Sequence, residues 1–462
     1  MVLTVIVIQN LLVVSAQETP LYKFRIKSIE IKGNRVTHES IIYRELEFSL
    51  GDSLSAPEII NAFRNSENNL RNTYLFNFVK INYRIGGFNV SVTIDLSERW
   101  YIWPAPILEI GERNLPAWLK DPELDELNYG SFLNWNNFRG RKELLQFKFR
   151  FGYKEHFMLK YVTSNLDKNK KHGLIFNINK FRQQEIILRN ENDRPVYFST
   201  DQKFIYESVS STITYTFRPH LYSLHSLTFG YNEHLFRNDE NRMEFLGVDE
   251  GKLKYTDLGY VFEYDVRDYK IYPLAGRLFR AGFYRQGLGI FQSFAEEKNY
   301  LTFTASNNSH LGSKFYSENA TKIRFTRDEN LPNIFEMALG YETYLRGFEY
   351  YTINGNSYYI LLNSLKYELM APRTYHLPSI PWQQFSRTHF AFYLNLFFDM
   401  AWVDGNFNLE NGNDLPNRLL YSTGLGLDLV SYYDQVLRLE CTLNSLGKPG
   451  LYLHLETPFR RW

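Results

Sequence analysis

"THFAFYLNLFFDMAW", residues 388–402, alternates between two kinds of side chain with a period of two. One face carries only large apolar side chains: Phe390, Phe392, Leu394, Leu396, Phe398, Met400 and Trp402. The other face is more polar and carries His389, Tyr393, Asn395, Phe397 and Asp399. Successive side chains of a β-strand point to opposite faces. The stretch therefore predicts a strand with one apolar and one largely polar face.

The same period continues through most of the chain after residue 128, for example in residues 142–152, 174–179 and 258–265. A soluble β-sandwich also alternates, so alternation alone leaves two architectures open. Large aromatic outward faces, strands of about 10 or more residues and charged opposite faces favour a transmembrane barrel with a water-filled lumen. We expect roughly 16 antiparallel strands between residues 128 and 458.

The composition narrows the range of functions. The formal net charge is +1, whereas a nucleic-acid-binding protein normally has a clear basic excess. The single cysteine, Cys441, cannot form an intrachain disulfide. The ten histidines have no H-E-x-x-H spacing, and no G-x-S-x-G turn or phosphate-binding loop occurs. The sequence therefore predicts no enzyme, no cofactor, no metal site and no nucleic-acid partner.

The N-terminus predicts export. Residues 2–14 are apolar, and Val14-Ser15-Ala16 resembles a signal-peptidase site. This apolar run is shorter than the roughly 20 residues that a spanning helix needs. We expect residues 1–16 to be a signal peptide and residues 17–22 to be a short N-terminal segment.

Residues 23–98 predict a small α/β domain in the order β-α-α-β-β. Residues 24–33, 76–85 and 88–98 alternate as strands do, and Gly86-Gly87 predicts a hairpin turn. Residues 37–46 and 55–76 have helical spacing, with Ser55 as the expected cap of the second helix. We expect Ile60, Phe63 and Leu70 to lie on one face of that helix.

This order, with the motifs G-N-x-x-T (33–37) and L-F-x-x-V (75–79), resembles a POTRA domain, the polypeptide-transport module that precedes outer-membrane barrels. Later stretches resemble the barrel of the BamA/TamA superfamily. Its first hairpin is matched by residues 128–145, its D-x-R-D…P-x-x-G motif by 262–276, and its late G-x-G-L strand by 421–430. The matching residues are Asn137, Phe138, Gly140 and Arg141, then Asp265, Arg267, Pro273 and Gly276. Lys448, Gly450, Leu453 and Leu455 fit the family's last-strand assembly signal loosely.

The resemblance implies a small member with one POTRA domain (23–98), a linker or periplasmic entry (99–127) and a 16-stranded barrel (128–462). It also implies a loop at about residues 342–356 that folds into the lumen, with Leu345, Arg346, Gly347 and Phe348 as its V-R-G-F/Y motif. In the family this arginine meets an acidic residue of an F-x-D-x-G motif on the inner wall. Here that motif reads Phe397, Asp399 and Ala401, with Ala in place of Gly. The alternation of residues 388–402 independently places Phe397 and Asp399 on the inward face.

The function implied is that of an outer-membrane assembly or insertion factor in a Gram-negative bacterium, with its POTRA domain in the periplasm. Its partners would be membrane lipid, unfolded outer-membrane or secreted client proteins, and accessory subunits bound through the POTRA domain. A client strand would pair at a lateral gate between the first strand, expected near residues 128–137, and the last, near 449–458. A secretion pore for a dedicated partner and a barrel scaffold remain alternatives.

Overall fold

The computed structural model describes residues 22–110, 127–199, 204–238, 240–248, 250–293, 297–326, 333–341, 343–381, 383–405 and 412–456. The predicted signal peptide, most of the segment 17–22 and residues 111–126 lie outside these ranges. Among the described residues, no helix is both long and apolar enough to cross a bilayer.

The N-terminal domain consists of β1 (Lys23–Lys32), α1 (Glu39–Tyr43), β2 (Ser53–Ser55), α2 (Ala56–Arg71), β3 (Phe76–Gly86) and β4 (Asn89–Glu98). Its sheet has the order β2-β1-β4-β3, and β1 runs parallel to β4. Glu58 accepts a hydrogen bond from the backbone N–H of Ser55 at 2.7 Å, which caps α2. The short β2 was not expected. Ile60 was placed wrongly, because Ile59 is the neighbour that shares the buried face with Phe63 and Leu70.

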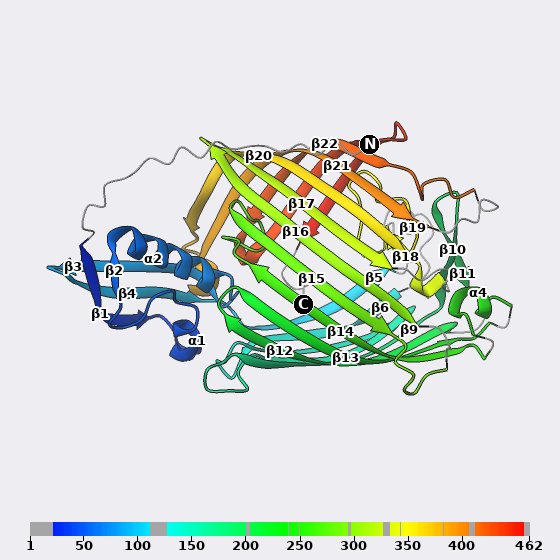
Figure 1. Ribbon diagram of the computed structural model, residues 1–462, viewed down its shortest axis with the longest axis horizontal. Helices are drawn as coiled ribbons and strands as arrows, with labels where there is room; N and C mark the ends of the chain where they lie inside the picture. The colour runs from blue at the N-terminus through cyan, green and yellow to red at the C-terminus, as the bar shows by residue number, and fades with distance from the viewer. Residues whose placement is uncertain are drawn as a thin grey trace.

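A single antiparallel sheet of sixteen strands forms the barrel (Figure 1). Its first eight strands are β5 (Ile102–Ile110), β6 (Leu127–Phe138), β7 (Glu143–Gly152), β8 (Lys154–Thr163), β9 (His172–Gln183), β12 (Tyr206–His220), β13 (Ser223–Phe236) and β14 (Lys252–Asp265). The other eight are β15 (Gly276–Gln286), β16 (Lys298–Gly312), β17 (Phe315–Thr326), β20 (Ser357–His376), β21 (Arg387–Asp404), β22 (Leu420–Ser431), β23 (Gln435–Asn444) and β24 (Pro449–Glu456). The predicted fold class, a barrel behind one small α/β domain, is confirmed.

Short elements occupy the connections between barrel strands. They are β10 (Glu185–Glu191), β11 (Arg194–Ser199), α4 (Arg242–Leu246), η2 (Asn333–Phe335), β18 (Met337–Leu339), β19 (Ile353–Asn354), α5 (Gln383–Ser386) and η4 (Tyr432–Asp434). Figure 1 shows β10, β11, α4, β18 and β19 at the end of the barrel opposite the N-terminal domain.

The barrel begins earlier than predicted. The first strand of the sheet is β5, inside the segment expected to be a linker, and β6 at residues 127–138 is the second. Pro104 and Pro106 obscured β5, because proline is unfavourable in a strand that must donate hydrogen bonds on both sides. An edge strand tolerates proline, and β5 pairs with β6 alone among the described residues.

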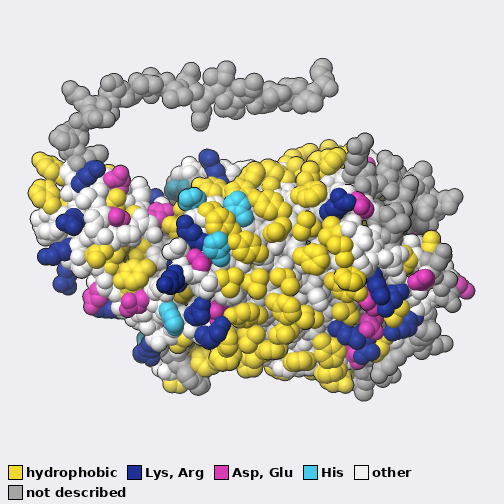
Figure 2. Space-filling view, turned by 60° about the horizontal axis from the view of Figure 1, so that its bottom comes forward, with side chains coloured by type: hydrophobic (Ala, Val, Ile, Leu, Met, Phe, Trp, Pro, Cys, Tyr) yellow, Lys and Arg dark blue, Asp and Glu magenta, His cyan; other side chains and the backbone are white. Residues whose placement is uncertain are grey.

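The alternation of β21 corresponds to the two surfaces of the barrel wall. Leu394, Leu396, Phe398 and Trp402 are exposed, whereas Tyr393, Asn395, Phe397 and Asp399 are buried. Figure 2 shows hydrophobic side chains spread over the face of the barrel in view, with charged side chains gathered toward its two ends. An apolar belt of this kind is what a bilayer requires of a barrel.

The N-terminal domain lies against one end of the barrel (Figure 1). The turns β6–β7, β12–β13 and β14–β15 all bind it, through Asn137, Arg218 and Arg267 respectively. β20 and β21 extend furthest toward it, and the carbonyl of Gln384 between them accepts a hydrogen bond from Asn77. Several of the described connections at this end of the barrel therefore hold the domain.

Candidate functional site

The loop that carries the V-R-G-F-like motif lies between β17 and β20 and folds into the barrel. Leu345 and Phe348 are buried and pack in one apolar cluster with Ile360, Ala401 and Leu420 of the barrel wall. We call residues 345–348 the loop lock. Its two apolar side chains anchor the loop on either side of Arg346.

Arg346 and Asp399 form a buried, bidentate ion pair. Nε and one terminal nitrogen of Arg346 donate to the two carboxylate oxygens of Asp399 at 2.5 and 2.7 Å. Asp399 is fully buried and also accepts a hydrogen bond from the backbone N–H of Asn363 at 3.1 Å. The guanidinium carbon lies 3.9 Å from the ring centre of Phe397. The planar fork of arginine suits both contacts at once, which lysine could not reproduce.

Gly347 is required by its surroundings. Its φ of +83° is in the left-handed region, and an added Cβ would lie 3.1 Å from Cβ of Ser422. Its carbonyl accepts a hydrogen bond from the side chain of Asn444 at 2.8 Å, so the loop lock also binds β23. Ala401, which replaces the family glycine, adds its methyl group to the apolar cluster around Leu345 and Phe348.

The first-hairpin motif meets the N-terminal domain rather than the lumen. The Asn137 side chain donates to Oγ1 of Thr37 at 2.9 Å and accepts from the backbone N–H of Lys142 at 2.8 Å. The carbonyl of Gly140 accepts from the N–H of His38 at 2.9 Å. An added Cβ at Gly140 would lie 2.1 Å from the carbonyl oxygen of Val36. Only glycine permits this close contact between the two domains.

The D-x-R-D…P-x-x-G motif builds the β14–β15 turn. Arg267 donates twice to the carboxylate of Asp265, both at 2.8 Å, and Gly276 has a φ of +95°. The carbonyl of Pro273 accepts a hydrogen bond from Nζ of Lys366 on the inner wall at 3.4 Å. The side chain of Asn72 in the N-terminal domain donates to the carbonyls of residues 267 and 268. The turn therefore contacts both the lumen wall and the N-terminal domain.

A carboxylate of the N-terminal domain, Glu45, is the buried centre of the contact with the barrel. Arg218 of β12 donates to both of its oxygens at 2.8 Å, and Nζ of Lys142 lies 3.6 Å away. Burial by itself would raise the pKa of Glu45, but the charges of Arg218, Lys142 and Arg44 outweigh it and hold this pKa well below its usual range. We call these four residues the Glu45 cluster.

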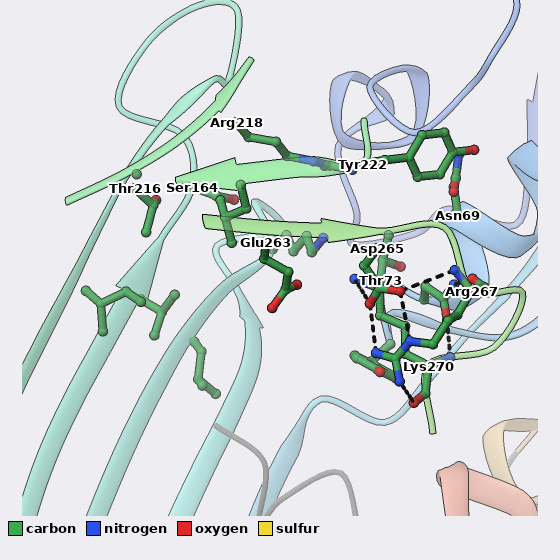
Figure 3. Close-up of a pocket in the computed structure, with 18 of the residues that line it drawn as sticks. Asn69, Thr73, Ser164, Thr216, Arg218, Tyr222, Glu263, Asp265, Arg267 and Lys270 are labelled. Atoms are coloured by element: carbon green, nitrogen blue, oxygen red, sulfur yellow. Dashed lines mark hydrogen bonds and ion pairs between the residues drawn. The ribbon is translucent and has the colours of Figure 1, made fainter. Parts of the chain in front are cut away.

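A cavity of about 930 Å³ lies between the two domains. Arg44, Glu45 and Asn72 line it from the N-terminal domain, and Lys142, Arg218 and Arg280 line it from the barrel. Figure 3 shows Asp265, Arg267 and Lys270 joined by dashed contacts at this cavity, with Asn69, Arg218 and Tyr222 nearby. Among the residues that line the cavity, lysines and arginines outnumber carboxylates.

The last-strand residues lie at the other edge of the sheet. Lys448 is in the turn before β24, where its N–H donates to the side chain of Asn444 at 3.1 Å. Leu453 and Leu455 of β24 are exposed on the outer surface, and Gly450 is next to the ring of Tyr452. The sheet ends at β5 and β24, and no ladder joins them within the described residues. We call the gap between these edges the seam and each edge strand a lip.

Sequence reasoning missed the Glu45 cluster and the contacts of Asn137 and Gly140 with the N-terminal domain. In the sequence, Glu45 directly follows Arg44, and such a pair is usually a solvated ion pair on the surface. Its partners Lys142 and Arg218 come from two barrel turns, and only the docking of the domains brings them together.

Comparisons with known proteins agree with this architecture. Residues 24–99 match the POTRA family model, described as "Surface antigen variable number repeat". CdiB from Escherichia coli is similar in structure, with a TM-score of 0.52 and 13% identity over 94% of this chain and 75% of that one. BamA from Haemophilus ducreyi lacking POTRA domains 1–3 has a TM-score of 0.49 and 16% identity over 94% of this chain and 83% of that one. A comparison with curated proteins gave no match.

These findings define the class: the chain is a POTRA-domain protein with a sixteen-stranded barrel. This architecture, one POTRA domain followed by a sixteen-stranded barrel, is the one that the sequence motifs predicted.

Proposed function

We propose that this chain is an outer-membrane protein that assembles or inserts client proteins by adding a client strand to the open edge of β24. The observation that carries the proposal is the unpaired seam between β5 and β24. An exposed strand edge recruits another strand through backbone hydrogen bonds. In lipid this tendency is stronger, because unpaired backbone groups have no water to bind.

The lip formed by β24 has regularly spaced backbone N–H and C=O groups that face the seam. The N–H of Asn444 donates to the carbonyl of Lys448 at 3.2 Å, so even-numbered residues of β24 pair with β23. The N–H and C=O groups of Leu451, Leu453 and Leu455 therefore point toward the seam. An incoming strand can form hydrogen bonds with all three residues.

The lip formed by β5 offers fewer backbone hydrogen-bond donors to the seam. The N–H of Asn136 donates to the carbonyl of Tyr101 at 2.7 Å, so odd-numbered residues of β5 pair with β6. The backbone groups of residues 102, 104, 106 and 108 therefore point toward the seam. Two of these residues are Pro104 and Pro106, which have no N–H to donate. Proline on an edge is a known protection against unwanted pairing, so we assign client pairing to β24.

Two proline substitutions test this assignment. Leu453→Pro removes a seam-facing donor from β24, and the matched control Leu108→Pro removes one from β5; neither breaks a ladder inside the sheet. A lost hydrogen bond costs about 1 kcal/mol, and ring clash adds to it, so Leu453→Pro should lower client assembly about fivefold or more. Leu108→Pro should change it less than about twofold.

The measurement is the abundance of outer-membrane proteins in cells that carry each variant in place of the native copy. Clients are the proteins whose abundance falls when the chain is deleted. If no outer-membrane or surface protein falls on deletion, the assembly function is wrong. If Leu108→Pro is the damaging variant, the function stands but the choice of lip is wrong.

A secretion pore for a dedicated partner is the second candidate. The cavity between the domains favours it, because a chain in transit would have to enter the barrel there. However, the loop lock and the β14–β15 turn both occupy the lumen and would have to move. For a pore, deletion would remove a protein from the culture medium and leave the outer membrane unchanged.

A further inference from the structure

Three side chains with metal-binding groups meet on the inner wall beside the loop lock. Glu349 comes from the loop, Glu440 from β23 and His454 from β24. Nε2 of His454 lies 3.5 Å from a carboxylate oxygen of Glu349 and 3.3 Å from one of Glu440. One ligand atom from each residue lies within 4.8 Å of the other two.

These separations suit a tetrahedral metal ion. Zn²⁺ binds imidazole nitrogen at about 2.0–2.1 Å and carboxylate oxygen at about 2.0–2.2 Å. Two ligands at these distances from a tetrahedral centre are about 3.4 Å apart. The two distances from His454 Nε2 are therefore close to what such an ion would impose.

The hydrogen bonding of the three residues is incomplete. Both oxygens of Glu349, one oxygen of Glu440 and Nε2 of His454 are buried and have no hydrogen bond of normal geometry within the described part of the chain. Glu440 is only 1% exposed. Buried polar atoms are nearly always hydrogen-bonded, and an absent ion is one of the few explanations for exceptions.

The charge balance points to the same ligand. Three other carboxylates of the inner wall each face a basic side chain: Asp399 faces Arg346, Glu318 faces Lys366 at 2.6 Å, and Asp428 faces Arg438 at 3.8 Å. Glu440 shares Arg346 at 3.6 Å, on the side away from His454. Glu349 and Glu440 together supply two negative charges, which one divalent cation would balance.

The imidazole is also held in place. The ring of His454 stacks on Tyr344 of the loop and on Tyr452 of β24, with interplanar angles of 12° and 25°. Restricting the ring in this way fixes the direction of Nε2 before an ion arrives, which is a feature of good metal sites.

We propose that Glu349, Glu440 and His454 bind one divalent transition-metal ion of the Zn²⁺ type, with water as the fourth ligand. The ion ties the loop to β23 and to β24, and so braces the lip at the seam from its inner side. Imidazole with carboxylates selects Zn²⁺ and its neighbours over Mg²⁺ or Ca²⁺, which prefer oxygen ligands alone. The site does not depend on which client the barrel serves.

The test uses the full chain in detergent micelles, stripped with EDTA and dialysed against Zn²⁺ alone. We expect about one bound ion per chain, as a single three-residue site requires. Loss of an outer-shell partner of a metal ligand weakens metal binding by about 10–100-fold. Because His454→Ala and Glu349→Gln remove ligands themselves, each should weaken Zn²⁺ binding by more than this. His310→Ala, an exposed histidine at the end of β16, is the matched control and should bind as the native chain does.

Co²⁺ supplies a second, spectroscopic readout of the metal ligands. Tetrahedral Co²⁺ with a nitrogen ligand has intense visible absorption, which the native chain and His310→Ala should develop and the two site variants should lack. Glu349→Gln changes only the loop, so its barrel should remain folded by circular dichroism. The proposal is wrong if the native chain takes up no Zn²⁺, or if the site variants bind it as tightly as the control.

Discussion

The two lips of the seam are supported by different parts of the molecule. Behind β24 lies the loop lock, which binds β23 through Asn444 and contacts Glu440 through Arg346. In front of β5 lies the POTRA domain, whose Thr37 and Leu75 bind the hydroxyl of Tyr101. Arg99 of the same segment pairs with Asp434 in the turn between β22 and β23. β24 thus has a free edge that is supported from inside the barrel. The edge of β5, by contrast, carries two prolines and is fixed at the end of the barrel that contacts the POTRA domain.

Because different parts of the molecule support the two lips, one lip can move without the other. Arg346 and Asp399 are buried inside the barrel, so a broken ion pair there cannot be replaced by water at low cost. The Glu45 cluster borders the cavity between the domains and has several cations for one carboxylate. We therefore expect the support of β24 to be rigid and the contact of the POTRA domain with the barrel to be the part that opens.

The largest effect should come from breaking the loop lock. Arg346→Ala leaves Asp399 buried without its partner, and loss of one member of a buried ion pair costs about 3–5 kcal/mol. The thermal midpoint of the barrel should fall, measured by its heat-dependent shift in gel mobility. Arg346→Lys should give an intermediate midpoint, because a single ammonium cannot form the fork. The control Arg277→Ala, at an exposed position, should leave the midpoint of the native chain unchanged. If Arg346→Ala also has the midpoint of the native chain, the pair does not support the barrel.

A smaller effect should come from Glu45→Gln. Arg218 and Arg44 then face a neutral amide, at a cost of about 1–3 kcal/mol for an unpaired buried group. The POTRA domain should detach from the barrel more often, which spin labels on the two domains would record as a broader distance distribution. The thermal midpoint of the barrel should stay unchanged, and so should the distances in the exposed control Glu39→Gln. A lowered barrel midpoint would show that the two supports are not independent.

The smallest effect is a dependence on pH. The pKa of Glu45 is lower in the docked state than its usual value of 4.5, so below that value the undocked state binds more protons. The contribution of Glu45 to docking is therefore fully present above about pH 4.5 and is lost as the pH falls further. The same spin-label distances, followed from pH 6 to about pH 3, should broaden in the native chain. The Glu45→Gln variant should show little of this pH-dependent broadening. If the variant and the native chain broaden equally, groups other than Glu45 cause the pH dependence.

The sequence predicted those parts of the fold that depend on local pattern. The alternation in residues 388–402 placed Asp399 on the inward face. Strand, helix and turn patterns predicted a small α/β domain, and the resemblance identified it as a POTRA domain. The resemblance also supplied Arg346 as the partner of Asp399, and the structure brings the two together. β5 was missed because two prolines hide a strand whenever its position at an edge is unknown. The Glu45 cluster and the triad of Glu349, Glu440 and His454 were missed because each joins segments far apart in the chain.

Site-specific photocrosslinking at the two lips tests the central claim most directly. A photoreactive amino acid at Leu453 of β24 or at Leu108 of β5, both exposed in the native chain, would capture a strand bound at either edge. We predict client adducts from position 453 and few or none from position 108. Adducts that form from position 108, or equally from both positions, would contradict the assignment of client pairing to β24.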